Sequence, residues 1–378
     1  MIHLFNPEND LALGLGCRNY TPPPHAAALH RAGALLPFWW AEDGDSVIVP
    51  EPFARHAGGL CREWGLRGKV YDGGSDIASP WGWSLDAKRQ FVAAGVDRQF
   101  LPSDETVERM RGLSHRRTSI GILDRLGEKY PRGVEFTDPV QAVDMEMNHR
   151  GCYVKSPWSS SGRGVFCASS LSREALQGRV AGIINRQGSV ILEPGLDKVM
   201  DFAALFHGDG DKVSFRGMSV FETESRGMYV GNIVAPQQHL VSMVTSQCDS
   251  DELWMLIGRL EAILSDLTRG VYSGWMGIDM MVYRGEGNEC RIMPCVELNL
   301  RMTMGVVAMK IAERLCVTDP HLLAWSHNAP AAGTVLLPPA EGFTLSLAKR
   351  LFKNKCESKA RERELDFDMN RGSIAVAM

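Results

Sequence analysis

The sequence predicts a small parallel α/β unit at the N-terminus, followed by a larger α+β region built from antiparallel strands. In residues 1–112, short apolar runs alternate with helical segments, a pattern typical of β-α-β units. From residue 152 onward, strand-like segments follow one another across glycine-containing turns, as antiparallel strands do. A chain of 378 residues is long enough for about two or three domains.

The N-terminal unit is predicted from three buried strands and a helix between the first two. Apolar runs at 2–5, 46–50 and 69–74 are each followed by turn residues. The segment 25–36, "HAAALHRAGALL", has apolar residues at helical spacing. This alternation favours a small parallel sheet.

Helix-start signals mark the second region. Ser103, followed by two acidic residues, predicts one helix start, and Ser114 predicts another, with Gly127 ending that second helix. The clearest helix is expected at 250–269, because Asp249 precedes it as a cap and apolar residues form a stripe along it.

Two strands are expected after that helix, at 274–284 and 290–301, with the turn-rich "GEGNE" between them. The tail at 317–378 differs in character from the rest of the chain. Its basic stretch 347–364 contains interleaved glutamates, which favours a solvated helix over a polyanion-binding one.

Composition and charge exclude several classes of protein. The chain is 44% hydrophobic and 23% charged with a formal net charge of −4, so a general affinity for nucleic acid or an anionic membrane is not expected. No apolar run is long enough to span a membrane, and the start "MIHLFNPEND" does not resemble a secretory signal. Nine cysteines without CxxC spacing favour reduced thiols in the cytoplasm over a structural zinc site.

The segment 153–166, "YVKSPWSSSGRGVF", combines a strand, a lysine and a Ser/Gly loop. Lys155 stands at the end of the expected strand, and Gly162 and Gly164 would let the backbone approach a ligand closely. No GxxxxGK[ST] pattern is present, so the loop is not a Walker motif. A phosphate-binding flap and a bare Gly/Ser hairpin remain equally open at this point. Trp158, within the segment, would either anchor the flap or mark the substrate entrance.

A second group of chemically capable residues lies at 277–301. Asp279 sits in an apolar run, and Glu297, Asn299 and Arg301 share one face of the next strand. Carboxylate and amide oxygens from neighbouring strands suit Mg²⁺, and the arginine suits a phosphate or carboxylate. The alternative is an exposed sheet face with alternating polar residues.

The metal hypothesis makes a demand on strand register. If Arg284 paired with Glu289, Asp279 and Glu297 would face opposite sides of the sheet. The hypothesis therefore requires a bulge, or a loop of another length near 285–289.

A third group is "SVILEPGLDKVMDF" at 189–202. An apolar strand ends at Glu193, a Pro-Gly break follows, and Asp201 comes eight residues after Glu193. A strand that leads into a hinge can present backbone groups to a nucleobase, although a plain strand and turn would have the same appearance.

Taken in their order along the chain, the three groups resemble the ATP-grasp superfamily over residues 103–316. The segment "ELNLR" is similar to the E-x-N-x-R form of its carboxylase-type members. The resemblance implies a nucleotide clamped between two α+β subdomains with antiparallel sheets, after a pre-ATP-grasp α/β domain. The implied pre-ATP-grasp unit spans 1–112, and subdomain A with the flap spans 113–195. Subdomain B with the metal site spans 196–316, and a C-terminal extension spans 317–378.

The resemblance also implies the roles of individual residues. Lys155 would be the strand lysine and Asp201 the ribose-binding acid, with Glu193 and Leu196 at the two hinge positions. The flap would consist of Ser159, Ser160, Ser161, Gly162 and Gly164. The Mg²⁺ ligands would be Asp279, Glu297 and Asn299. Arg301 would stabilise the transferring phosphate or an acyl phosphate, and Lys155 would contact the α-phosphate. Many members carry a further lysine on a helix, which Arg116 or Arg117 would replace here with altered geometry.

The implied function is a Mg²⁺- and ATP-dependent ligase that activates a carboxylate as an acyl phosphate for attack by an amine or a thiol. Its expected partners are a small-molecule or peptide carboxylate and an amine acceptor. The protein is expected in the cytoplasm, and a homodimer is one candidate assembly. Two alternatives remain, a small-molecule phosphotransferase and a non-catalytic nucleotide-binding module.

The acceptor side is poorly specified by the sequence. One candidate segment follows the first strand and contains Asn6, Glu8, Asn9 and Asp10. The other lies at the middle strands and contains Asn232, Gln237, Gln238 and His239. Turn formation is the alternative for the first segment.

Overall fold

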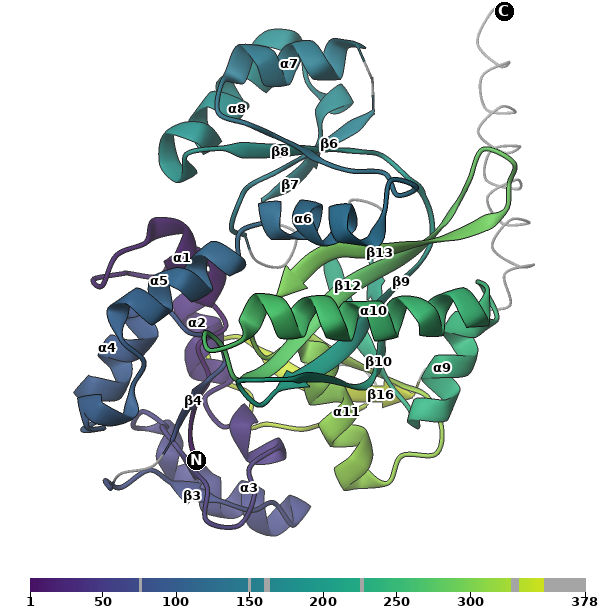
Figure 1. The fold of residues 1–378 in the computed structure, drawn as a ribbon. Coiled ribbons are helices and arrows are strands. Elements are labelled where there is room, and N and C mark those ends of the chain that lie inside the picture. Colours follow the sequence, from purple (N-terminus) through teal and green to yellow (C-terminus); the bar gives the residue numbers. More distant parts are fainter. Residues whose placement is uncertain (75–76, 149–150, 160–163, 225–227, 328–332, 350–378) are drawn as a thin grey trace, which may run out of the picture. The chain divides into compact units, whose positions relative to one another are not determined.

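The computed structural model describes residues 1–74, 77–148, 151–159, 164–224, 228–327 and 333–349. Residues Met1–Ala348 form one compact unit. Most of the basic stretch 347–364 lies outside the described residues. Figure 1 shows the course of the chain, which contains three β-sheets among the described residues.

The first sheet is parallel, with strand order β3-β2-β1-β4. Its strands are β1 Ile2–Leu4, β2 Ser46–Val47, β3 Lys69–Val70 and β4 Ala78–Pro80. The accompanying helices are α1 Asn9–Leu15, α2 Pro24–Ala32, α3 Ala57–Trp64, α4 Leu85–Ala93 and α5 Asp104–Leu113, with short 3-10 turns at Leu36–Trp39, Phe53–His56 and Arg98–Phe100. The predicted parallel α/β unit is confirmed, but its strands are shorter than the apolar runs and β4 was not predicted.

The second sheet is small and antiparallel, with strand order β5-β8-β6-β7. Its strands are β5 Val134–Phe136, β6 Cys152–Lys155, β7 Val165–Cys167 and β8 Val190–Pro194. Helices α7 Pro139–Asn148 and α8 Arg173–Gln187 cover it, and Ala168–Ser170 forms a 3-10 turn after β7. Val154 and Leu192 of the sheet pack with Val143, Leu176 and Val180 of the helices in one apolar cluster.

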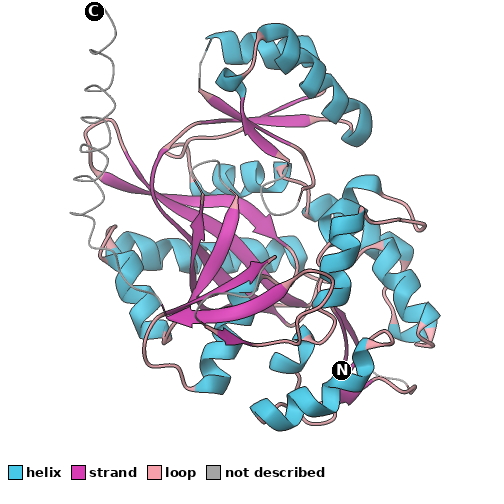
Figure 2. Cartoon of the chain, turned by 180° about the vertical axis from the view of Figure 1, so that it is seen from behind, coloured by secondary structure: helices cyan, strands magenta, loops and turns pink. Residues whose placement is uncertain are grey.

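The third sheet has eight strands in the order β13-β12-β9-β10-β11-β14-β16-β15. They are β9 Asp197–Gly208, β10 Val213–Thr223, β11 Tyr229–Val234, β12 Gly274–Arg284, β13 Cys290–Asn299, β14 His321–Ser326, β15 Thr334–Val335 and β16 Thr344–Lys349. The helices associated with this part of the chain are α6 Arg117–Leu126, α9 Gln237–Thr245, α10 Ser250–Thr268 and α11 Met304–Leu315. Figure 2 shows the long strands of this sheet from behind. Strands β14 to β16 come from the segment 317–378 that the sequence analysis set apart.

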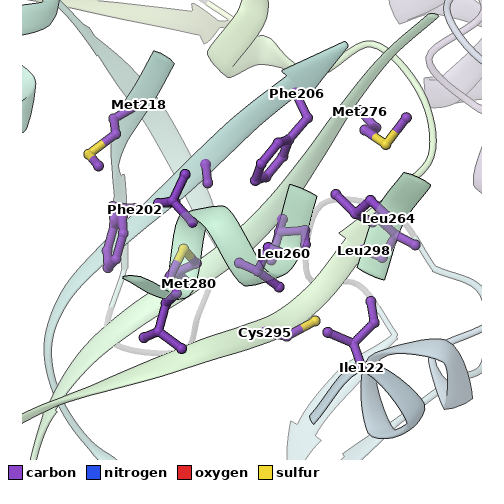
Figure 3. Packing of buried hydrophobic residues seen from close by; sticks show 14 of the residues in the cluster. Ile122, Phe202, Phe206, Met218, Leu260, Leu264, Met276, Met280, Cys295 and Leu298 are labelled. Carbon is purple, nitrogen blue, oxygen red and sulfur yellow. The ribbon is translucent and has the colours of Figure 1, made fainter. Parts of the chain in front are cut away.

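Helices α10 and α11 pack on opposite faces of the large sheet. On β9, Phe202, Ala204 and Phe206 belong to the apolar cluster that contains the α10 residues, some of which Figure 3 shows. Ala203 and Leu205 alternate with them and belong to the cluster that contains α11. Side chains of a strand alternate between its two faces, so both faces of β9 are buried.

The local helix signals were right where a side chain caps the backbone. Ser103 accepts a hydrogen bond from the amide of Thr106, and Asp249 accepts one from the amide of Glu252, which starts α5 and α10. The start predicted at Ser114 is wrong: its hydroxyl donates to the carbonyl of Met110 in the last turn of α5, and α6 begins at Arg117.

The register of β12 and β13 meets the demand of the metal hypothesis. Arg284 pairs with Cys290 rather than with Glu289, and a bulge then places Asp279 opposite Glu297. Residues 294–296 of β13 stand opposite the single residue Met280. Pro294 lies in this bulge, and β13 is at the edge of the described sheet. A residue without a backbone N–H is tolerated at such a position because bulges and edge strands leave backbone groups unpaired.

None of the eight cysteines within the described ranges takes part in a disulfide. Across those same ranges, no helix combines the length and apolarity needed to cross a membrane.

Candidate active site

A cavity of about 520 Å³ opens on the α11 side of the large sheet. Its floor includes Ala203 and Ser219, which the sheet register aligns with Asp279. Its other walls come from the small antiparallel sheet and from segments that follow β1 and β4. The cavity thus collects side chains from parts of the chain up to about 320 residues apart.

The three predicted metal ligands meet at one place in this cavity. Asp279 and Glu297 are directly opposite on β12 and β13, and Asn299 lies two residues further on the same face. Burial and repulsion from Glu297 raise the pKa of Asp279 well above the ordinary range of an aspartate, although Arg301 and a hydrogen bond from Asn299 oppose this. Two facing carboxylates in a buried site are stabilised by a cation.

The donor set of this site fits a magnesium ion. Within the described residues, no group of three or more His, Cys, Asp and Glu side chains is arranged to bind a metal. The candidate set instead offers two carboxylates and an amide oxygen, and Mg²⁺ is commonly bound by one or two carboxylates with waters and phosphates in the remaining positions. Softer metals that favour thiolate or imidazole are not suited to these donors.

Lys155 forms an ion pair with Glu193 at the edge of the cavity. Lys155 ends β6, and Glu193 lies near the end of the neighbouring strand β8. Lys155 is 7% exposed, so its charge is held at a fixed place on the rigid sheet. Leu196 follows in the connection between β8 and β9 and also lines the cavity.

The base of the predicted flap is well packed. The amide of Ser156 donates to the carbonyl of Gly164 at 2.9 Å, which closes the loop between β6 and β7. A Cβ atom at Gly164 would lie 2.4 Å from the Cβ of Ser159, so a glycine is required at this position. Ser159 lines the cavity, whereas Ser160, Ser161 and Gly162 lie outside the described residues.

Arg116 and Arg117 have different surroundings. Arg116 is 6% exposed, lines the cavity and contacts the Glu297 carboxylate at 2.9 Å and the Ser159 hydroxyl at 3.0 Å. Arg117 is not among the lining residues; its exposed guanidinium pairs with Glu135 at 2.7 Å. Of the two candidates, only Arg116 has the geometry to act in the cavity.

Asp201 lines the cavity and is already engaged by two donors. Lys198 approaches its Oδ2 at 2.6 Å, and the hydroxyl of Thr223 donates to the same oxygen at 2.7 Å. Both partners also line the cavity and were missed by the sequence analysis. Alternation along β9 would put Lys198 on the opposite face from Asp201, and a register shift between Met200 and Lys198 brings the two side chains together.

Arg301 is bound by Asp10 of helix α1. The arginine Nε lies 3.1 and 2.9 Å from the two carboxylate oxygens, and its Nη2 lies 2.8 Å from Oδ2. Both side chains are about 15% exposed. This fork-like pair links helix α1 to the segment that follows β13.

The remaining acceptor-side candidates divide into two groups. Asn232 lines the cavity, donating to the Ser219 hydroxyl at 2.6 Å and accepting a hydrogen bond from Tyr229. The other candidates do not line it: Asn6, Glu8, Asn9, Gln237, Gln238 and His239. Glu8 instead contacts His30 at 2.8 Å.

Trp158 anchors the loop rather than marking an entrance. It is 8% exposed, its indole N–H donates to the carbonyl of Arg111 at 3.1 Å, and its ring lies edge-on to His115. The side-chain amide of Gln187 accepts a hydrogen bond from the backbone N–H of Trp158 and donates one to its carbonyl. These contacts fix the start of the flap to α5 and α8.

Comparison with known proteins identifies the fold. No protein-family model matches the sequence, and no curated protein sequence is significantly similar to it. N5-carboxyaminoimidazole synthetase from Staphylococcus aureus, complexed with ADP, aligns over 96% of this chain and 96% of its own, with 10% identity and a TM-score of 0.51. N5-carboxyaminoimidazole ribonucleotide synthetase from Thermus thermophilus aligns over 93% and 94%, with 13% identity and a TM-score of 0.50. The arrangement of the three sheets and these two alignments together show that the chain has the ATP-grasp fold that its motifs indicate.

Proposed function

We propose that this protein is a Mg²⁺-dependent ligase that uses ATP to activate a carboxylate as an acyl phosphate, which an amine then attacks. The single observation that carries the proposal is the cavity in which Lys155, the facing acids Asp279 and Glu297, and Arg301 come together. Two solved structures of the same fold are named as synthetases, one of them complexed with ADP. Because a shared fold alone does not define chemistry, the proposal depends on the side chains.

The nucleotide would lie between the small sheet and the floor of the large sheet. Lys155 would bind the α-phosphate, and the backbone near Glu193 and Leu196 would contact the adenine edge. Asp201, which Lys198 and Thr223 hold in position, would accept a hydrogen bond from the ribose. The flap that starts at Ser159 would cover the phosphates.

The metal and the cations would act on the reacting groups. Mg²⁺ bound by Asp279, Glu297 and Asn299 would neutralise charge on the triphosphate. Arg116 reaches Glu297 and the flap base, so it can orient one metal ligand and contact the phosphate chain. Arg301, held by Asp10, can orient the substrate carboxylate and stabilise charge on the transferring group.

The proposed reaction has two steps. A carboxylate oxygen attacks the γ-phosphorus of ATP, the bond to the bridging oxygen breaks, and ADP leaves. The amine nitrogen then attacks the acyl carbon, inorganic phosphate leaves, and the amine proton passes to solvent. Positioning and charge stabilisation carry most of the acceleration in such reactions.

The test is ADP release from Mg·ATP with panels of carboxylates and amines, repeated with hydroxylamine as the nucleophile. A ligase gives a carboxylate-dependent hydroxamate, whereas a phosphotransferase gives a stable phosphorylated product, and a binding module gives neither. We expect Asp279→Asn and Glu297→Gln each to lower the rate by about 100-fold or more.

The matched control is Glu289→Gln, which removes an exposed acid from the turn end of the same hairpin. Its rate should equal that of the wild type. If both site variants retained full ADP release, the assignment of the metal ligands would be wrong.

A further inference from the structure

Arg116 is the one cation, among the described lining residues, that forms an ion pair with a proposed metal ligand. Its Nη1 lies 2.9 Å from Oε2 of Glu297. The other cationic lining side chains pair with acids that are not proposed metal ligands: Lys155 with Glu193, Lys198 with Asp201, and Arg301 with Asp10. Within the described lining, Arg116 is thus the direct counter-charge of Glu297.

The guanidinium of Arg116 gives each of its three nitrogens a different partner. Nε donates to the carbonyl of Ser156 at 3.0 Å, Nη2 donates to the hydroxyl of Ser159 at 3.0 Å, and Nη1 faces the carboxylate. The backbone amide of Arg116 also donates to the carbonyl of Pro157 at 3.1 Å. A single buried residue therefore joins a proposed metal ligand to the base of the flap.

Helix α6 is bound to β13 at a second point beside this ion pair. Ser119, one turn after Arg116, accepts a hydrogen bond from the backbone amide of Leu298 at 3.2 Å. Leu298 follows Glu297 directly, so the bond fixes the helix to the strand next to the paired charges. Ser119 is buried, so water competes little for this bond. The fold itself therefore places the Arg116 charge beside Glu297.

A divalent cation at Glu297 would share the carboxylate with this guanidinium. Charges of the same sign a few ångströms apart repel each other, and the repulsion is little screened in a buried site. Asp279 faces Glu297 across the two strands, but it cannot replace the carboxylate oxygen that Arg116 already uses. While Arg116 keeps this partner, the facing acids are therefore expected to bind a divalent cation weakly.

A nucleotide phosphate would give Arg116 another partner. Ser159 starts the flap and lines the same cavity as Arg116 and Glu297. A phosphate beneath the flap would lie beside the guanidinium, and arginine can bind phosphate through two parallel hydrogen bonds. A phosphate chain carries more negative charge than one carboxylate, so the guanidinium would favour it. Glu297 would then be released to bind the metal ion that accompanies the phosphates.

We propose that Arg116 is a positioning residue that occupies Glu297 in the nucleotide-free protein and releases it to the metal when phosphate binds. The metal would then enter with the nucleotide rather than before it. The proposal rests on the proposed function, because the metal ligands and the phosphate position are taken from it, and it adds an order of binding to that function.

Metal binding to the full chain without nucleotide is the first measurement. The probe is Mn²⁺, which takes the same oxygen donors as Mg²⁺ and is counted by electron paramagnetic resonance at pH 8. We expect Arg116→Gln to bind Mn²⁺ about tenfold more tightly than the wild type, or better, because the competing charge is gone. Arg116→Lys retains the charge and should stay within about twofold of the wild type. Unchanged or weaker Mn²⁺ binding in Arg116→Gln overturns the proposal.

Arg117→Gln is the matched control for the change in net charge. Arg117 is the next residue, its side chain is 57% exposed, and it does not line the cavity. Its Mn²⁺ affinity should equal that of the wild type, and an equal gain in both glutamine variants overturns the proposal. Adding Glu297→Gln to Arg116→Gln should abolish the gained affinity. A gain that survives this second change would place the cation elsewhere and would also overturn the proposal.

Nucleotide binding is the second measurement and should change in the opposite direction. With Mg²⁺ in excess, calorimetry should show ADP binding about tenfold weaker in Arg116→Gln and unchanged in Arg117→Gln. A folding defect would lower both the Mn²⁺ and the ADP affinity, so opposite shifts distinguish positioning by Arg116 from a structural role. A parallel loss of both affinities overturns the proposal.

Turnover separates this inference from the ligase function. Opposite shifts of the two affinities, without ADP release for any pair of carboxylate and amine, would support the role of Arg116 and exclude the ligase. Magnesium-dependent ADP release by the wild type, together with unchanged Mn²⁺ binding in Arg116→Gln, would support the ligase and overturn the order of binding.

Discussion

Gly164 shows how one residue sets the shape of the flap base. Because a Cβ at this position would meet Ser159 at 2.4 Å, we expect Gly164→Ala to displace Ser159 from Arg116. The predicted result is a loss of about 1–3 kcal/mol in the free energy of unfolding and weaker ADP binding by calorimetry.

Gly178→Ala in helix α8 is the control, since nothing lies within 4 Å of its added Cβ. That variant should gain about 0.5–1 kcal/mol from helix propensity and bind ADP normally. Equal behaviour of the two variants would contradict the packing argument.

Asp10 is expected to position Arg301 rather than to contact the nucleotide. In Asp10→Asn the guanidinium loses its charged partner in a mostly buried site, so stability should fall by about 1–3 kcal/mol. The kcat for ADP release should fall while the KM for ATP stays within about twofold.

The exposed pair of Arg31 and Glu341, at 2.7 Å, provides the comparison. Glu341→Gln should cost less than about 0.5 kcal/mol in urea unfolding, because exposed ion pairs contribute little. A KM effect at Asp10 that matched the kcat effect would indicate a direct binding role instead.

At the scale of elements, the junction between α5 and α6 carries a pH-sensitive contact. His115 is 3% exposed, and burial, together with the nearby Arg117, lowers its pKa to about 4, against the opposing effect of Glu135. Its Nδ1 accepts the amide N–H of Arg117 at 3.0 Å, which requires a neutral ring.

The sign of the resulting pH dependence follows from proton binding. Between pH 6.5 and about 4 the unfolded chain binds a proton at His115 that the folded chain does not, so the free energy of unfolding decreases as pH falls through this window. Above pH 6.5 the contribution is constant. Urea unfolding of wild type and His115→Gln across this range should give a steeper decline for the wild type, and parallel curves would refute the assignment.

Local elements were predictable from sequence, and contacts between distant segments were not. The caps at Ser103 and Asp249 depend on backbone groups three residues away, so a sequence pattern specifies them. The pairing of Asp279 with Glu297 depends on a three-residue bulge around Pro294, and no local pattern reveals its length. The failed start at Ser114 is a local failure, since its hydroxyl donates to the carbonyl of Met110 four residues earlier and so serves the preceding helix.

For the whole molecule, the nucleotide site is predicted to link the small sheet to the large one. Mg·ADP at 100 times its dissociation constant should raise the free energy of unfolding by about 2.7 kcal/mol. Asp279→Asn should remove the magnesium-dependent part of this gain, measured by urea unfolding with and without Mg²⁺. A gain independent of magnesium in the wild type would place the metal elsewhere.

The site as a whole could be proposed from sequence only through the order of its motifs. Arg301 and Asp10 are 291 residues apart in the chain, and Trp158 is fixed by Gln187, so neither contact follows from spacing. Lys198, Thr223 and Tyr229 carry no motif, and only the folded chain shows that they line the cavity. The three-dimensional fold therefore adds cavity residues that the motifs do not name.

The continuous floor from β13 to β14 has a consequence for how such a protein can diversify. The hydrogen-bonded ladder fixes the spacing between the facing acids on β12 and β13 and the aromatic residues Phe221 on β10 and Trp325 on β14. Exchanging Phe221 or Trp325 would reshape the far part of the floor without changing the register that holds the two acids opposite each other. Under the proposed function, a change of substrate range is therefore expected in these side chains, with the facing acids kept in register.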